Sequence, residues 1–455
     1  MPQENAAGYR INASPTKEFF IHMITRDVPL TRAILDLVDN CVDGARREKP
    51  GGDYEGLWVR IELSRERFRI VDNCGGIPVE VAREYAFRFG RPPDAEETRG
   101  SIGQFGVGMK RSFFKLGRVF MVESKTSRSR FLMNVDVERW MAENGEEKTN
   151  DWHFQFDEVE ENINTDADEI GTKIEIQNLF EAISESFDLE TFRNRLIDEI
   201  SAAHSLSMDR GIAITVNAIP VQYTPHKLLQ SEALRPAFLE KVYERKHIDG
   251  KDAPPVHVKL YAGVGERNIR DGGWYIFCNG RLVLGADHTS LTVWGSPHNI
   301  PQYHADYAYF RGYAFFDSDH AALLPWTTTK TGIDVDSRIY QVVQQEMIEL
   351  TKPVIEFLKR LEKERRSRDL GESDDEPLQQ ALNCAREQQA EKITELSRFV
   401  SPQTPPPPPR PRVTSIQYSK SVELVAKAKR LLGVTSNVAV GERTFEYFMK
   451  NEGDE

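Results

Sequence analysis

One predicted helix carries three polar side chains that could bind a metal ion and activate water. Asp36, Asn40 and Asp43 stand at i, i+4 and i+7 within residues 33–45, so they share one helix face. Carboxylate and amide oxygens one turn apart can hold Mg²⁺ and orient a water molecule. Taken alone, the stretch is equally consistent with an ordinary amphipathic helix whose polar face is solvated. The predicted buried face carries Ile34, Leu37, Val38 and Cys41.

A further carboxylate stands at the end of a predicted strand. Asp72 follows the strand at 68–71 and precedes two glycines, the second of which is Gly76. A carboxylate at a pocket floor can accept the exocyclic amine of adenine, and glycine lets the backbone approach a ligand closely. The alternative is a simple Asp–Asn–Gly turn, which is favoured when the motif is taken alone.

The glycine-rich segment at 100–110 is typical of a phosphate-binding loop. Gly103, Gly106 and Gly108 lead into a predicted helix, whose N-terminus contributes about half a positive charge. Lys110 could add a point charge to a phosphate. The spacing is neither that of a Walker loop nor that of the dinucleotide-binding fingerprint. The alternative is a flexible glycine loop.

Composition narrows the classes of protein. A chain of 455 residues, 39% hydrophobic, predicts two or three domains with substantial cores. No apolar run approaches membrane-spanning length and the start is unlike a signal peptide, so we expect a cytoplasmic protein and no membrane partner. The four cysteines are too far apart for a zinc site. The net charge of −12 disfavours nucleic-acid binding, although a local basic face stays open.

Alternating apolar and polar residues predict the strands that must position these motifs. The predicted strands lie at 57–63, 68–71, 119–124, 131–135 and 171–176. The first two are expected to form a hairpin. A short helical lead-in is expected before residue 30.

These motifs together resemble the GHKL ATPase superfamily of gyrase, the heat-shock chaperone ATPases, histidine kinases and MutL. The resemblance covers about residues 15–180 and consists of four motifs in the family's order. They are the helix D-L-V-D-N-C-V-D-G-A, the adenine motif D-N-C-G-G-I, the phosphate motif G-Q-F-G-V-G-M-K and the strand G-T-K-I-E-I. The style of the motifs is closest to heat-shock-chaperone-like and MORC-type proteins.

The resemblance implies a Bergerat-type ATP-binding α/β sandwich, with ATP and Mg²⁺ as ligands. It implies that Asn40 binds Mg²⁺, that Asp72 binds the adenine amine with support from Thr172, and that Asp36 is the general base toward water. A lid would span about Phe89 to Gly106. The implied nucleotide contacts are Asn40, Asp43, Asp72, Gly76, Gly103, Gln104, Phe105, Gly106, Val107, Gly108, Met109, Lys110 and Thr172.

Two positions depart from the family's pattern. Asp36 is one methylene shorter than the usual glutamate, and a base must lie within hydrogen-bond reach of its water, so we expect slow hydrolysis. In the adenine motif, Cys74 stands where the first of two glycines is usual.

The second half predicts another α/β domain. We expect a helix at 187–204 and strands near 212–216, 257–261 and 274–283. Asn279-Gly280 is a strong hairpin signal and is similar to the hairpin of transducer domains in MutL and gyrase relatives. The pattern favours an exposed surface charge at Arg281. By the same resemblance, Lys330 in a threonine-rich loop is expected to reach the γ-phosphate and take part in catalysis.

The predicted fold is α+β, with an ATP-binding domain at 1–183, a transducer-like domain at 184–340 and a helical C-terminal extension. The extension divides into a helical segment at 341–400, a proline-rich linker at 401–412 and a short helical tail at 413–455. An apolar stripe from Tyr340 to Leu361 indicates a helix with a kink at Pro353. This helix either packs on the same chain, which is favoured, or forms a dimer contact. We expect further helices at 378–399, 421–432 and 441–450. The tail is too small to bury much alone and is expected to dock on this chain, a second copy or another protein.

The leading functional hypothesis is slow Mg²⁺-dependent ATP hydrolysis that opens and closes a homodimer. The second is a non-hydrolysing, ATP-gated interaction module. The third, a protein histidine kinase, is disfavoured because none of the ten histidines is followed by Asp or Glu, as a phosphoacceptor histidine usually is.

Overall fold

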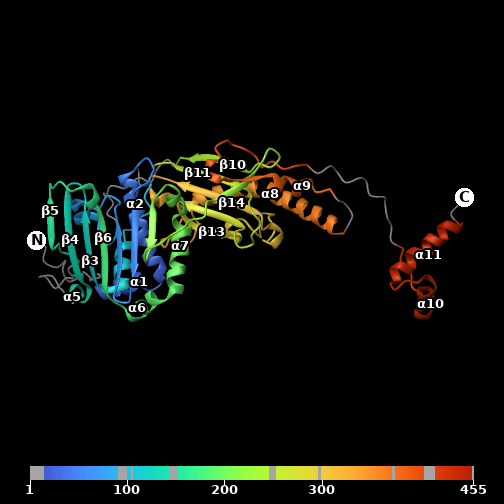
Figure 1. Cartoon of the computed structure of the whole chain (residues 1–455), viewed down its shortest axis with the longest axis horizontal. Helices are drawn as coiled ribbons and strands as arrows, with labels where there is room; N and C mark the ends of the chain where they lie inside the picture. Colours follow the sequence, from blue (N-terminus) through green and yellow to red (C-terminus); the bar gives the residue numbers. More distant parts are fainter. Residues whose placement is uncertain are drawn as a thin grey trace, which may run out of the picture. The chain divides into compact units, whose positions relative to one another are not determined.

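A computed structural model describes residues 15–90, 100–103, 106–142, 152–244, 253–295, 299–370, 375–403 and 416–452. The chain divides into two compact units, Met1–Pro402 and Gln403–Glu455. The fold is α+β, as predicted, with two large sheets in the first unit (Figure 1).

The first sheet has eight strands in the order β5-β4-β3-β6-β2-β1-β7-β8. The predicted hairpin is confirmed, because β1 pairs antiparallel with β2. β7 pairs parallel with β1, so this sheet continues past residue 183, where we placed a domain boundary. The strands are β1 Trp58–Leu63, β2 Arg67–Asp72, β3 Gly117–Lys125, β4 Ser129–Asp136, β5 Glu158–Glu161, β6 Gly171–Leu179, β7 Ala213–Val216 and β8 Ile219–Pro220.

Helices associated with this sheet carry or support the chemical motifs. α4 contacts β3 and β6, α2 packs against α4 and α7, and α7 contacts β7. The predicted apolar face of α2 is buried, but so are Asp36, Asp39 and Asp43, so the alternative of a solvated polar face is wrong. The helices are α1 Lys17–Thr25, α2 Leu30–Glu48, α3 Val79–Val81, the π-helix Ala82–Ala86, α4 Gly108–Leu116, α5 Val137–Ala142, α6 Glu181–Asp188 and α7 Glu190–Asp209.

The second sheet has five strands in the order β10-β11-β14-β12-β13. Its strands are β10 Ala237–Tyr243, β11 Val256–Val264, β12 Gly273–Cys278, β13 Arg281–Asp287 and β14 Phe310–Asp317. The predicted Asn-Gly hairpin joins β12 to β13, and φ is +46° at Asn279 and +71° at Gly280. Positive φ at both central residues is the geometry that a two-residue hairpin turn of this type requires.

Helix α8 (Arg338–Asp369) lies along the second sheet and contacts β11 and β14 (Figure 1). The predicted stripe from Tyr340 to Leu361 contributes buried side chains to the chain's own core, so the intramolecular interpretation is supported. Pro353 lies inside one continuous helix rather than at a break.

The predicted helix at 378–399 is wrong beyond Cys384, which is about two thirds of its length. α9 covers only Pro377–Cys384, and the chain then forms β15 (Arg386–Gln389). β15 pairs antiparallel with β9 (Lys227–Gln230), a partner more than a hundred residues earlier. Pairing with that strand edge overrides the local helical pattern, which a sequence window cannot detect.

The second unit contains the two predicted tail helices, α10 (Val422–Leu432) and α11 (Asn437–Glu452). Neither helix has a buried residue, which fits the expectation that this tail cannot form a core of its own. Residues 404–415, which include most of the predicted proline-rich linker, lie outside the described residues. None of the helices that the structure describes has an apolar stretch long enough to cross a bilayer.

Candidate nucleotide site

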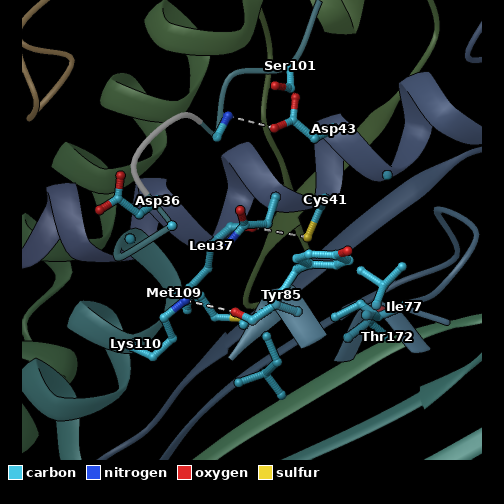
Figure 2. A pocket seen from close by; sticks show the side chains of 18 of the residues that line it. Asp36, Leu37, Cys41, Asp43, Ile77, Tyr85, Ser101, Met109, Lys110 and Thr172 are labelled. Carbon is cyan, nitrogen blue, oxygen red and sulfur yellow. Dashed lines mark hydrogen bonds between the residues drawn. The ribbon is translucent and has the colours of Figure 1, made fainter. Parts of the chain in front are cut away.

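A cavity of about 700 Å³ lies where the predicted motifs meet. Its size falls within the range of about 300 to 1,000 Å³ that is usual for small-molecule sites. The walls come from α2, the end of β2, the segment after α3, the start of α4, the start of β6 and the loop that carries Lys330. Figure 2 shows Asp36, Cys41 and Asp43 along one helix, with Thr172 and Ile77 on the opposite side from Asp36.

Asp43 holds the backbone at the base of the predicted lid. Its two carboxylate oxygens accept hydrogen bonds from the N–H groups of Ile102 and Gly103, each at 2.8 Å. These bonds occupy both oxygens, so Asp43 fixes the glycine segment against α2.

Asp36 is buried and forms an ion pair with Arg111 of α4. The Nε and Nη2 atoms of Arg111 both donate to Oδ2 of Asp36. The other oxygen, Oδ1, lies 3.8 Å from the Nζ atom of Lys330. A Cβ atom at Gly108 would lie 3.2 Å from the Asp36 carboxyl carbon, so glycine there lets the start of α4 approach this side chain.

Asn40 lines the cavity one turn after Asp36. Its Nδ2 atom is buried and has no hydrogen-bond partner among the described residues. An unpartnered buried amide is costly unless a ligand or water completes it. The Asn40 side chain is therefore suited to a ligand that enters the cavity. No cluster of three or more His, Cys, Asp or Glu side chains that could bind a metal occurs in the described part of the chain.

Asp72 and Thr172 face each other on the paired strands β2 and β6. The Asp72 Oδ1 atom accepts the Cys74 backbone N–H at 2.8 Å, and the Thr172 hydroxyl lies 3.3 Å from the Ser124 hydroxyl. Burial raises the pKa of the Asp72 carboxyl, and the hydrogen bond from Cys74 partly opposes that rise. Asp72 therefore combines a buried carboxylate with direct access to the cavity.

The substituted adenine motif keeps a compact turn. Gly76 has φ +71°, and a Cβ atom there would lie 2.2 Å from the Lys125 carbonyl oxygen, so only glycine fits. Gly75 also has positive φ, at +90°, whereas Cys74 does not. The pair of glycines after Cys74 supplies the left-handed conformations, so the missing first glycine is not needed for the turn.

The phosphate motif opens at the N-terminus of α4, whose first-turn N–H groups have no intrahelical acceptors. Gly103, Gly106, Val107, Gly108, Met109 and Lys110 line the cavity. Gln104 and Phe105, like most of the predicted lid, lie outside the described residues.

Lys110 is buried, and its Nζ atom donates to the Ala86 carbonyl at 2.8 Å (Figure 2). Burial lowers the pKa of the Lys110 amine to about 7. In this conformation the amine is committed to the segment before the lid.

Lys330 lines the cavity from the loop after β14, and its expected contact with a γ-phosphate stays a prediction. Its Nζ atom lies 2.7 Å from Oδ2 of Asp39, a carboxylate on α2 that is fully buried. The other oxygen of Asp39 accepts the Nε–H of Arg281 at 2.6 Å. The expectation of an exposed charge at Arg281 is wrong: the side chain is 1% exposed, because Asp39 compensates its charge in the interior.

Three basic side chains surround the buried Asp39 carboxylate. Burial alone would raise the pKa of the Asp39 carboxyl, but Arg281, Lys330 and His204 lower it well below its usual range. His204 from α7 lies 3.1 Å from Asp39, and burial lowers the pKa of its imidazole despite that neighbour. Asp39 is therefore ionised and His204 neutral near pH 7.

The sequence motifs did not identify three residues of this site: Asp39, Arg111 and Arg281. Asp39 lies one helical turn from Asp36, and Arg111 follows Gly108 by three residues on the face of α4 toward α2, so their spacing offered a signal. Arg281 offered none, because its partner lies 242 residues away along the chain.

Comparison with known proteins agrees with this arrangement. Residues 28–172 match the family model described as histidine kinase-, DNA gyrase B- and HSP90-like ATPase. The matched range begins just before α2 and ends at Thr172, so it contains the first three motifs and the first two residues of the fourth. No curated protein matches the chain significantly. Residues 28–172 of this chain are thus similar to the ATPase domain that defines the GHKL superfamily.

Proposed function

We propose that this protein binds ATP with Mg²⁺ in the cavity between α2, α4 and β6 and hydrolyses it slowly. The observation that carries the proposal is the joining of an adenine-type acceptor and a phosphate-type cradle in one cavity. The acceptor for adenine is formed by Asp72 and Thr172. The cradle for the phosphates is formed by Asn40, the start of α4 and Lys330. The family match supports ATP as the nucleotide.

At the end of the cavity that would hold adenine, the Asp72 carboxylate accepts a hydrogen bond from the exocyclic amine. Guanine carries a carbonyl oxygen at the corresponding position, which would face the carboxylate without a hydrogen bond between them. A buried polar group left unpaired costs about 1 to 3 kcal/mol, and more when it is charged. Asp72 therefore selects ATP over GTP.

At the phosphate end, Asn40 supplies an oxygen ligand for Mg²⁺, and the phosphates and water supply the rest, which is the usual composition of a magnesium–nucleotide site. The bound ion would neutralise phosphate charge. The N-terminus of α4 and Lys330 add positive charge from the protein.

For hydrolysis, Asp36 orients a water and accepts its proton through Oδ1, while Arg111 holds Oδ2. The paired arginine fixes the carboxylate in one rotamer, and a fixed base at the correct distance is what general-base catalysis requires.

ATP binding also drives pairing of two chains. Exposed Phe19 and Met23 on α1, a helix that contacts α4, offer apolar surface for that contact.

A second candidate function, a non-hydrolysing ATP-gated module, is favoured by one observation. Oδ2 of Asp36 is occupied by two donors from Arg111, and the side chain is one methylene shorter than the glutamate it replaces. An aspartate held in this way can act as a structural ion pair without activating water. In that case ATP would still bind and still drive assembly.

Titration calorimetry of the purified chain with ATP, ADP and GTP, with and without Mg²⁺, tests the binding proposal. We expect Asp72→Asn to weaken ATP binding about tenfold or more, because a hydrogen bond to a charged group is lost. Asn40→Ala should abolish the gain in ATP affinity that Mg²⁺ gives. Asn134→Ala, which removes an exposed amide on β4, is the matched control and should change neither. Equal affinity for GTP and ATP, or no nucleotide binding, would contradict the proposal.

A further inference from the structure

Arg281 occupies the junction between the second sheet and α2. It is the first residue of β13, and its Nε–H donates to Asp39 on α2 at 2.6 Å. Its Nη1 atom donates to the Lys330 backbone carbonyl at 3.3 Å. One arginine thus contacts both the main chain of Lys330 and the carboxylate that holds the Lys330 amine.

Lys330 is held in a conformation that lysine rarely adopts. Its φ is +54°, in the left-handed region that disfavours residues with a Cβ atom. Such a conformation persists only where surrounding contacts hold it. Here the Lys330 N–H donates to the Thr327 carbonyl at 2.9 Å, and Arg281 and Asp39 hold the carbonyl and the amine.

The charges of this cluster leave room for an anion. Three cationic side chains, Arg111, Arg281 and Lys330, face two buried carboxylates, Asp36 and Asp39. The cluster therefore carries one positive charge in excess. Arg281 is fixed by bonds in two directions, whereas the Lys330 amine is a point charge on a flexible stem and can turn toward an incoming anion.

The same hairpin also contacts the base of the lid. The Asn279 side-chain amide donates to the carbonyls of Ser101 and Ser318, at 2.9 and 3.1 Å. Arg46 on α2 donates to the carbonyls of Gly100 and Asn279. The β12–β13 turn is therefore bonded to the segment that leads into the lid and, through Arg281, to Lys330.

We infer that Arg281 is a positioning residue that holds Lys330 at the phosphate end of the nucleotide site, with Asp39 keeping the Lys330 amine in place until a terminal phosphate competes for it. The inference rests on the proposed function, in which Lys330 contacts the γ-phosphate. It assigns to Arg281, a residue that does not touch the nucleotide, control over the discrimination between ATP and ADP.

The ratio of ATP to ADP affinity, measured by calorimetry, tests the inference. Lys330→Ala should lower the ratio about tenfold, since it removes a charge-assisted contact to the terminal phosphate alone. Arg281→Gln should lower the ratio by a similar factor while ADP affinity stays unchanged. The double variant should lose no more than either single variant, because both act through one contact.

Arg311→Gln is the matched control. Arg311 is also a buried arginine of the second sheet, but its guanidinium donates to the carbonyls of Glu266, Ala308 and Phe310. None of these three hydrogen bonds goes to Lys330 or to α2. Its replacement should perturb the sheet and leave the ATP to ADP ratio as in wild type. A ratio lowered equally in Arg311→Gln would overturn the inference in favour of a general structural role.

A second readout does not depend on nucleotide. The labelling rate of the Lys330 amine by an amine-reactive reagent, followed by mass spectrometry, should be low in the wild type, where the side chain is 8% exposed. It should rise about tenfold or more in Arg281→Gln, because labelling tracks the population in which the amine is released. If Arg281→Gln fails to fold, Arg281→Lys replaces it in both measurements. This variant keeps the positive charge beside Asp39 but loses the hydrogen bond to the Lys330 carbonyl.

The affinity ratio and the labelling rate together distinguish failure of the inference about Arg281 from failure of the proposed function. An unchanged labelling rate and an unchanged ATP to ADP ratio in Arg281→Gln would overturn the inference. A ratio near one in the wild type, also unaltered by Lys330→Ala, would instead remove the γ-phosphate contact from the proposed function. The labelling rate then decides alone whether Arg281 positions Lys330.

Discussion

Asp72 shows how a single buried carboxylate can couple nucleotide binding to pH. Burial raises the pKa of this carboxyl, so it takes up a proton at a higher pH than an exposed aspartate does. The amine of adenine needs an acceptor, and only the ionised form offers both oxygens as acceptors. The proposed contact with adenine therefore favours the carboxylate and lowers its pKa in the complex.

We predict that ATP affinity falls as the pH drops through the pKa of Asp72 in the free protein. Above that pKa the affinity should be level, since the carboxylate is already ionised. Dissociation constants measured between about pH 4 and pH 7 give the profile. Asp72→Asn should bind weakly at every pH, with this dependence removed. A wild-type profile identical in shape to that of Asp72→Asn would contradict the assignment.

Cys74 illustrates what a motif comparison can and cannot predict at the residue scale. The sequence showed that a glycine was missing from the usual pattern, and the structure shows Gly75 and Gly76 taking the left-handed conformations instead. The place of Asp72 in the cavity could be predicted because it depends on local order along the chain. The occupation of Asp36 by Arg111 could not, because it depends on how α2 and α4 pack.

At the scale of elements, α4 connects the part of the cavity beside Asp36 to the segment at 82–86. Its first residue, Gly108, lies against Asp36. Lys110 and Arg111, in the same helical turn, are both buried. Lys110 bonds the Ala86 carbonyl, so α4 and the π-helix at 82–86 are tied by one buried amine. The cost of keeping that amine charged depends on pH.

We predict a pH-dependent stability difference between wild type and Lys110→Met. Burial lowers the pKa of the folded-state amine to about 7, whereas the unfolded chain keeps the usual value near 10.4. Between these values the unfolded state binds more protons, so the wild type gains stability relative to the variant as the pH rises. From about pH 7 to pH 9 the gain should be on the order of 2 kcal/mol.

Urea unfolding of both proteins at several pH values measures this difference directly. Lys115→Met on the same helix is the matched control, because Lys115 also donates to a backbone carbonyl, that of Thr25. A difference between wild type and Lys110→Met that stays constant with pH would show that the Lys110 amine is not desolvated as described.

The elements themselves were largely predictable from the sequence. Six strands of the first sheet, the Asn-Gly hairpin, α2 and α8 follow from local periodicity and turn chemistry, and the structure confirms them, whereas the short strands β5 and β8 were not predicted. β15 was missed because its strand conformation depends on pairing with β9. Arg281 was placed on the surface for the same kind of reason: a hairpin charge is usually exposed, and only the approach of α2 makes this one buried.

At the scale of the whole molecule, the candidate nucleotide site is built from elements of both sheets of the first unit. α2 and β2 bring Asp36, Asn40 and Asp72, while the loop after the last strand of the second sheet brings Lys330. A ligand that contacts Asn40 and Lys330 together therefore bonds the two sheets to each other. Under the proposed function, binding and hydrolysis of ATP would change how the sheets are held, which is the physical basis for the proposed ATP-driven clamp.

Release of phosphate from ATP by wild type and by Asp36→Asn is the measurement that tests the central claim most directly. Both proteins are assayed at saturating Mg²⁺ and ATP, with bound nucleotide and the fraction of dimer measured on the same samples. The account predicts slow turnover in the wild type and a loss of about a hundredfold or more in Asp36→Asn, with ATP binding and dimer retained. No turnover in a wild type that binds ATP and dimerises, or equal turnover in both proteins, would contradict it.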